Sequence, residues 1–504
     1  MRRLDELGPQ VLEHPVFLIV PSHSLRSHLL ERLVHARGHS IAGLGCWTLH
    51  GFALEVLERL GNPTPPNGKL LPILARRLAR QEKPLRECLD HLSDGYASVV
   101  GTVSDLLEAG LEPAHGEALE EALVEEGSQV AGRAEISRAC SLIRVAIGVH
   151  ETMESLGIGH VSTLLQQATD LLRTSPTPPF PGGALLVHGF ADATGLATDF
   201  LEALLQRFGG TLYLDRPPDP ADRDRDDPGI EFSRRFSERL LAIAEVEKAP
   251  PCELPSSTIN LFRSLGTQAE VREVASRIRE LLDRGARPES VGVVARQLER
   301  YRSALRTHFW RLGIPFSSVG TLGPQHPAGR RLQALLDLVA KGDSARVDRW
   351  LDARAEDPGE VALFDLRLAL AGLGAGRLRD VAGLELERLV TGETYPLPVR
   401  HGYSSEDDGD PTVRLSRRKI PTEALRSAQS EAKQLCQLFE AWKTRRDWND
   451  HQQSIECLLT LLHWDSGQGL IGEVRRTIDR LAAELPDNLH LEFDELVLLL
   501  TDAL

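Results

Sequence analysis

Short apolar runs, several followed by amphipathic stretches, constrain this chain more than any other feature of its sequence. The runs cover residues 16–20, 184–187, 211–214, 258–262 and 291–295. Behind the first, second and fourth runs, apolar side chains recur at helical spacing, as in Leu25, Leu29, Leu30, Leu33 and Val34. Buried strands that alternate with such helices are typical of a doubly wound, parallel α/β sheet. We expect the first three runs to pair in one sheet and the last two in another.

Proline-rich or charged breaks separate these runs, at residues 62–69, 174–183, 215–229 and 248–257. Such stretches continue neither a helix nor a central strand, so they mark loops or boundaries. Residues 70–173 and 330–504 lack strand texture and look mainly helical. We therefore predict two α/β domains, over residues 1–257 and 258–504, the second of them incomplete. Their helical insertions would lie at about residues 66–175 and 330–504.

The formal charge of −15 and the isoelectric point near 5.6 count against a simple nucleic-acid coat, which would be basic. A local basic groove on an acidic protein still attracts phosphate, so DNA binding stays open. The sequence has neither a membrane-length apolar run nor an apolar leader, which predicts a cytoplasmic protein without a membrane partner. Its six cysteines include no C-x-x-C pair, which favours reduced thiols. We expect no metal and no cofactor.

Polar residues follow the first apolar run and precede another apolar helix. Ser22, His23 and Ser24 come directly after the first run, and Thr48 and His50 stand at the start of the next apolar stretch. Hydroxyls and helix N-terminal N–H groups at strand ends can hold phosphate. Two simpler interpretations remain: Ser24 is a helix cap, and His50 is an ordinary histidine at a helix start. A basic group further on, at Arg414, Arg417, Arg418 and Lys419, we interpret as a solvated turn.

The order of these segments resembles a known family. A strand, a serine-containing turn, a helix and then Thr48-Leu49-His50-Gly51-Phe52-Ala53 resemble motif Ia and the following segment of UvrD-like superfamily 1 helicases. In that family these segments line the path of single-stranded DNA. The resemblance implies that Ser22, His23, Ser24, Thr48 and His50 touch the strand. Thr48 and His50 would then face a cleft rather than the core.

Residues 185–194, Leu-Leu-Val-His-Gly-Phe-Ala-Asp-Ala-Thr, resemble the segment of the same helicases that carries an aspartate–glutamate pair. His188 and Gly189 stand where the magnesium-holding aspartate and the water-activating glutamate would be, and Asp192 matches the run that follows. Neither imidazole nor glycine does a carboxylate's work on Mg²⁺ and water. The departure is similar to the B subunit of AddAB/RexAB helicase–nucleases and its PD-(D/E)XK relatives, whose second motor is inactivated. The resemblance therefore implies a degenerate ATPase motif at His188, Gly189 and Asp192, with no catalytic residue.

Residues 260–317 resemble the start of the second RecA-like domain of those proteins. They hold Gln268-Ala269-Glu270 at a helix start and close with Gly313-Ile314-Pro315. Both predicted domains would then be RecA-like. The sequence shows neither a G-x-x-x-x-G-K-[ST] loop nor a convincing nuclease pattern, and it stops inside an apolar helix. We therefore expect a chain truncated before the nuclease domain.

These observations predict a non-catalytic DNA-handling scaffold, the helicase-like part of an AddB-type subunit in double-strand-break repair. Its partners would be single-stranded or duplex-end DNA and an AddA-type helicase–nuclease subunit. One alternative is a helical protein–protein adaptor without DNA contact. Another is an α/β-hydrolase-like enzyme, since His188-Gly189 after a strand is similar to an oxyanion segment, but the G-x-S-x-G nucleophile elbow is missing.

Overall fold

The computed structural model describes residues 15–38, 42–61, 63–92, 95–127, 132–176, 180, 183–214, 228–245, 258–295, 298–317, 327–355, 361–398, 415–444, 446–464, 469–486 and 488–504. Its contacts divide the chain into two compact units. The large unit joins Met1–Val246 to Arg330–Leu504, and the small unit is Glu247–Gly329. The predicted boundaries of two RecA-like domains, 1–257 and 258–504, stay a prediction.

A parallel sheet of four strands forms the α/β part of the large unit. The strands are β1 (Val16–Val20), β2 (Leu44–Thr48), β3 (Ala184–Phe190) and β4 (Thr211–Leu214), in the order β2-β1-β3-β4. The expected pairing of the first three apolar runs is confirmed. Strand β2 was not expected, because Leu-Gly-Cys-Trp-Thr contains a glycine and runs directly into a helix.

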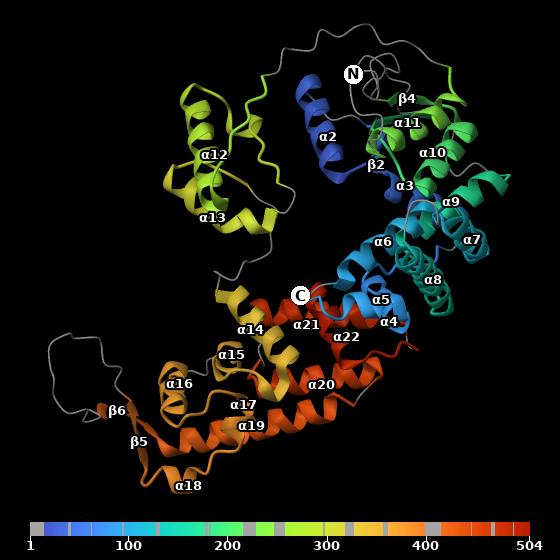
Figure 1. Ribbon diagram of the computed structural model, residues 1–504. Coiled ribbons are helices and arrows are strands. Elements are labelled where there is room, and N and C mark those ends of the chain that lie inside the picture. The colour runs from blue at the N-terminus through green and yellow to red at the C-terminus, as the bar shows by residue number, and fades with distance from the viewer. Residues whose placement is uncertain are drawn as a thin grey trace. The chain divides into compact units, whose positions relative to one another are not determined.

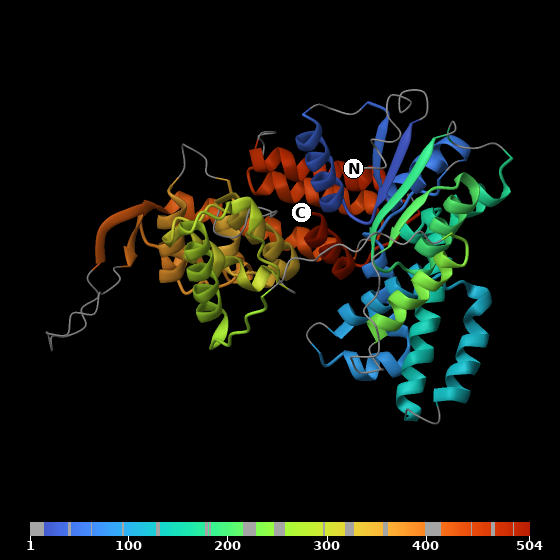
Figure 2. The same ribbon diagram turned by 90° about the horizontal axis from the view of Figure 1, so that it is seen from above.

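Helices cover both faces of this sheet (Figure 2). On one face lies α2 (His23–Arg37), whose Leu25, Leu29 and Leu33 pack against β1 and β3. On the other lie α3 (Leu49–Leu60), α9 (Val161–Thr174) and α10 (Gly195–Phe208). The doubly wound α/β class is confirmed for this sheet. Val34, which we placed on the apolar face of α2, is 45% exposed.

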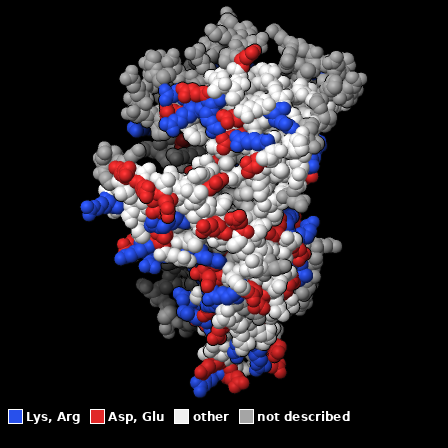
Figure 3. All heavy atoms as spheres, turned by 90° about the vertical axis from the view of Figure 1, so that its right-hand side faces the viewer, with Lys and Arg blue, Asp and Glu red and all other residues white. Residues whose placement is uncertain are grey.

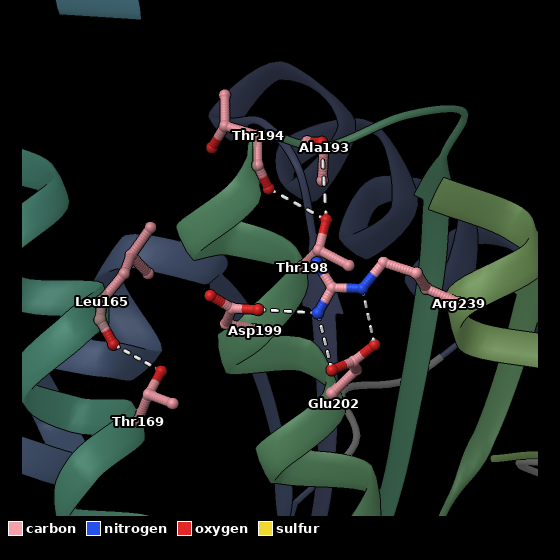
Figure 4. Close-up of polar contacts among 8 residues, drawn as sticks. All are labelled: Leu165, Thr169, Ala193, Thr194, Thr198, Asp199, Glu202 and Arg239. Carbon is pink, nitrogen blue, oxygen red and sulfur yellow. Dashed lines mark hydrogen bonds and ion pairs between the residues drawn. The ribbon is translucent and has the colours of Figure 1, made fainter. Parts of the chain in front are cut away.

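A polar contact fixes α11 (Pro228–Leu241) to α10. The Arg239 guanidinium donates to Asp199 at 2.6 Å and to Glu202 at 2.7 Å (Figure 4). Next to Asp199 in the sequence, the Thr198 hydroxyl donates to the carbonyl of Thr194, the N-cap of α10, at 2.9 Å.

Two helical regions complete the large unit. The first holds α4 (Leu71–Gln81), α5 (Lys83–Leu89), α6 (Gly95–Ala109), α7 (Gly116–Gly127) and α8 (Arg133–Ser155). The second holds α14 (Pro327–Lys341), α15 (Val347–Ala353), α16 (Leu363–Gly372), α17 (Leu378–Ala382), α18 (Leu386–Leu389), α19 (Thr422–Trp442), α20 (Trp448–Leu461), α21 (Gly469–Glu484) and α22 (Phe493–Ala503). One hydrophobic core runs through both regions, and α4 contacts α22 (Figure 1).

An antiparallel pair, β5 (Thr394–Pro398) and β6 (Leu415–Pro421), lies in the second helical region. It corrects our interpretation of the basic group as a solvated turn, because Arg417, Arg418 and Lys419 lie on β6. Arg418 is 2.7 Å from the Asp365 carboxylate. Arg414 lies outside the described residues.

The small unit packs α12 (Gly266–Asp283) against α13 (Leu298–Arg311) around Ala275, Ile278, Phe309 and Ile314. Residues 258–262 and 291–295, expected as strands, form no sheet in the described structure. Their apolar side chains reach the surface, with Leu261 94% and Val294 96% exposed. A strand needs a hydrogen-bonded neighbour, and none of the described residues supplies one. The expected second sheet is therefore absent from the described part of the chain.

Within the described residues, no helix is both long and apolar enough to cross a bilayer. No three histidine, cysteine, aspartate or glutamate side chains of that part are grouped so that they could hold a metal ion. The described cysteines, at positions 46, 88, 140, 436 and 457, are free thiols.

Candidate functional site

The carboxyl ends of β1, β2 and β3 meet at one edge of the sheet. Val20 is the partner of Thr48 on β2, and Ile19 is the partner of Val187 on β3. The segments that follow these strands therefore begin side by side, although they are far apart in the sequence. This edge brings together Ser22, His23, Ser24, Thr48, His50, His188 and Gly189, while Asp192 lies further along the loop after β3.

The hydroxyls of Ser22 and Thr48 are helix caps. Ser22 Oγ accepts the N–H of Leu25 at 3.2 Å, and Thr48 Oγ1 accepts the N–H of Gly51 at 3.3 Å. The cap of α2 is thus Ser22 rather than Ser24, which stands inside the helix. Thr48 is only 9% exposed. The expectation that Thr48 faces a cleft is wrong, because capping turns its hydroxyl into the first turn of α3.

Two helices begin at this edge. The first N–H groups of a helix have no intrahelical acceptor and carry partial positive charge. His23 and Ser24 stand in the first turn of α2 and His50 in that of α3, and all three are exposed. Paired helix N-termini with exposed polar side chains are suited to an anion such as phosphate.

A polar cluster from α6 and the start of α9 lies near His50. Desolvation lowers the pKa of His50, and the Glu108 carboxylate partly opposes this. Desolvation likewise lowers the pKa of the buried His160, with Glu108 opposing it and His50 adding to it. Both surroundings therefore favour the neutral imidazole.

His160 is held in place by hydrogen bonds. Its Nδ1 accepts the N–H of Ser162 at 3.3 Å, and its Nε2 is 3.5 Å from Ser104 Oγ. Ser104 in turn donates to Glu108 Oε1 at 3.2 Å. Sequence reasoning missed this cluster, since Ser104 and His160 are 56 residues apart and come close because α6 and α9 both pack against α10.

The last residues of β3 include no carboxylate pair. His188 is half-buried and meets Tyr213 edge to face at 6.0 Å. Gly189 has a φ of +88°, and Asp192 is exposed beyond the end of the strand. The imidazole and the glycine lie near the carboxyl end of β3, so these two positions offer Mg²⁺ no carboxylate oxygen.

The strand order reverses between the neighbouring strands β1 and β3: β1 is followed by a connection to β2 on one side, and β3 by a connection to β4 on the other. The segment after β1 leads to α2 on one face, and the segment after β3 leads to α10 on the other. Open α/β sheets commonly bind ligands in the crevice at such a switch point. Here Leu25 and Pro21 cover Gly189, because a Cβ at that glycine would lie 2.4 Å from Leu25 Cδ2 and 3.5 Å from Pro21 Cδ. The crevice is therefore filled beside Gly189.

Fold and site define an α/β protein whose sheet edge is suited to an anion and lacks a magnesium-binding carboxylate pair. No family model matches the chain. It is similar to the B subunits of the ATP-dependent helicase/deoxyribonucleases of Geobacillus kaustophilus (strain HTA426) and Geobacillus thermodenitrificans (strain NG80-2). Each is 29% identical over 126 residues, which is 24% of this chain and 10% of the relative. The match thus spans about a tenth of the length of these curated relatives and shows a distant relationship.

Proposed function

We propose that this chain is a non-catalytic DNA-handling scaffold that holds single-stranded DNA at the carboxyl edge of its sheet. The observation that carries the proposal is the pairing of Val20 with Thr48, which sets the starts of α2 and α3 next to each other. Two helix N-termini then offer backbone N–H groups to neighbouring phosphates of one strand.

The named residues have distinct roles in this proposal. Ser22 and Thr48 shape the two helix starts as caps, and His23, Ser24 and His50 contact the strand with their exposed side chains. Contacts to phosphate position a strand without reading its sequence. His188, Gly189 and Asp192 are the remnant of an ATPase motif, since the first two lack a carboxylate and Leu25 fills the space beside Gly189.

The relatives' name supports the wider assignment, because it describes one component of an ATP-dependent helicase/deoxyribonuclease. We infer that this chain acts in DNA double-strand-break repair together with an AddA-type subunit. That partner would supply the ATP-driven movement for which this chain has no phosphate-binding loop. We place both proteins in the cytoplasm.

The test is fluorescence anisotropy with a labelled single-stranded oligonucleotide over a salt series. We expect modest affinity and a log–log salt slope of roughly −1 to −3, since each phosphate contact contributes about 0.7. The variant Ser24→Ala with His50→Ala should weaken binding, and Thr48→Ser, which keeps the cap, should not. His91→Ala, on an exposed histidine between α5 and α6, is the matched control.

Two results would contradict the proposal. Absence of binding at low salt would favour the helical adaptor without DNA contact. If the variant Ser24→Ala with His50→Ala bound DNA as tightly as the wild-type chain, the DNA would not bind at this edge of the sheet.

A further inference from the structure

Helix α2 is cationic in an acidic chain. Its fifteen residues hold three arginines, three histidines and a single acidic residue, Glu31. The whole chain has a formal charge of −15, and α7, for comparison, carries five glutamates and no basic residue. A local excess of positive charge of this kind marks a surface for a polyanion.

One exposed face of α2 points away from the sheet and carries His28, Arg32 and His35. Leu25, Leu29 and Leu33 pack against the sheet. Ser24, His28, Arg32 and His35 follow one another at intervals of three or four residues and therefore share one stripe. All four are exposed. The stripe is about 16 Å long at 1.5 Å per residue, and its first member stands at the edge already described.

Several arginines elsewhere in the large unit are engaged by carboxylates. Arg144 contacts Glu82 and Glu120, and Arg239 contacts Asp199 and Glu202. On the side of the molecule drawn in Figure 3, basic and acidic side chains alternate, and neither sign forms a broad patch. The interspersed opposite charges leave no broad local excess of positive charge on that side.

Arg32 differs from these arginines. No ion pair joins its guanidinium to a carboxylate among the described residues, and the neighbouring Glu31 lies 3.7 Å from His35 Nε2. The positive charge of Arg32 is thus available to a phosphate. Arg26, nearer the sheet, adds positive charge close to Cys46, whose thiol pKa it lowers against the larger raising effect of desolvation.

We propose that the exposed stripe of α2, Ser24, His28, Arg32 and His35, holds the phosphodiester backbone of single-stranded DNA where it continues past the sheet edge. This inference rests on the proposed function and adds the direction of the strand. From the starts of α2 and α3 the strand runs along α2 toward its C-terminal end. Arg32 makes the central ion pair, and Glu31 is the one residue of the helix that opposes binding.

The experiment uses the full chain and a labelled single-stranded oligonucleotide, with anisotropy read from about 25 to 200 mM salt. Arg32→Gln should lower the affinity roughly five- to tenfold at about 50 mM salt and reduce the salt slope by about 0.7. Arg32→Lys, which keeps the charge, should retain both. Glu31→Gln should raise the affinity. Arg173→Gln, an exposed arginine of α9 on the opposite face of the sheet, is the matched control and should leave binding unchanged.

The outcomes separate the two proposals. If the wild-type chain binds and Arg32→Gln equals Arg173→Gln in affinity and slope, the path along α2 is wrong while the sheet-edge site stands. If Glu31→Gln fails to strengthen binding, the electrostatic basis of the stripe is refuted. If the wild-type chain binds no oligonucleotide at the lowest salt, the proposed function fails and this inference with it. Circular dichroism checks that each variant is folded.

Discussion

Leu25 stands where a side chain on Gly189 would have to go: a Cβ built on that glycine lies 2.4 Å from Leu25 Cδ2. The backbone of Gly189 also has a φ of +88°, which side-chain-bearing residues rarely adopt. We predict that Gly189→Ala destabilises the protein by roughly 2 kcal/mol or more, from backbone strain and overpacking together. Gly38, with a φ of +72° and no atom within 4 Å of its Cβ position, provides the control. In urea unfolding, Gly38→Ala should lower the free energy of unfolding by less than Gly189→Ala does. Equal losses would mean that the Leu25 side chain moves aside at no cost.

The same contact bears on nucleotide binding. We predict that the chain binds no ATP–Mg²⁺ in the micromolar range, as measured by calorimetry, because the sequence has no glycine-rich phosphate loop and the edge has no carboxylate pair. His188→Asp with Gly189→Glu should still show no ATP hydrolysis, and the glutamate should lower the melting temperature. Turnover by this double variant would show that the phosphate-binding part exists elsewhere in the chain.

Thr48 gives a prediction about stability rather than binding. Its Oγ1 accepts the N–H of Gly51 at the start of α3. Thr48→Ala should therefore lower the free energy of unfolding by about 1 kcal/mol, the usual contribution of a helix N-cap. Thr48→Ser keeps the acceptor and should lose much less, and this comparison separates the cap from the lost methyl group. Equal stability of Thr48→Ala and wild type in urea would show that the cap contributes nothing.

A buried carboxyl in the second helical region makes stability depend on pH. Glu431 accepts from Trp350 Nε1 at 3.0 Å and lies 3.3 Å from Arg354. Desolvation raises the pKa of Glu431, and Arg354 is the main influence that lowers it. Arg354→Met should therefore raise the pKa of Glu431 further.

The sign follows from proton linkage. A carboxyl with a raised pKa in the folded state holds its proton more tightly there than in the unfolded chain, so stability falls as the pH rises between the two pKa values. The melting temperature of Arg354→Met, relative to wild type, should thus be lower at about pH 8 than at about pH 5. Arg349→Met, which breaks an exposed pair with Asp337, should show a small loss at both pH values. A loss of equal size at both pH values for Arg354→Met would contradict the assignment.

Arg77 connects the two helical regions. Its guanidinium donates to Glu495 at 2.6 and 2.8 Å and to the His490 carbonyl at 2.7 Å, and Glu495 is only 6% exposed. Arg77→Ala should cost about 2 to 3 kcal/mol in urea unfolding, because it strips hydrogen bonds from a buried charged group. Arg388→Ala removes an exposed pair with Glu385 and should cost less than about 1 kcal/mol. Similar costs would mean that Glu495 finds another partner.

The apolar runs of the sequence predicted β1, β3 and β4, because strands buried on both faces leave a continuous apolar signal. Strand β2 was not predicted, because Gly45 interrupts its apolar run. Thr48 is both the last residue of this strand and the N-cap of the helix that follows. The runs at 258–262 and 291–295 carry the same signal without forming a sheet in the described structure. Apolar composition shows that a segment can be buried, but not whether a neighbouring strand is there to pair with it.

The nearness of Ser22–Ser24 to Thr48–His50 could be predicted from the sequence, because parallel strands end at one edge of their sheet. The direction in which each hydroxyl points depends on the backbone at the helix start. The capping roles of Ser22 and Thr48 could therefore be assigned only from the structure. His160 and Glu108 could not be assigned to the site at all, since they lie outside the matched segments and meet His50 through tertiary packing.

The contact between Arg77 and Glu495 also sets an order of events during synthesis. The two residues are 418 positions apart, and a ribosome takes roughly 20 to 80 seconds to add that many. The four strands of the sheet are complete once Leu214 has emerged, so the sheet closes early. Over the rest of that interval Ile73 and Leu74 of α4 lack Leu496 and Leu500 of α22, with which they share a core. The nascent chain therefore exposes an apolar helical surface on α4 until α22 has been made, and a chaperone that shields α4 would raise the yield of folded protein.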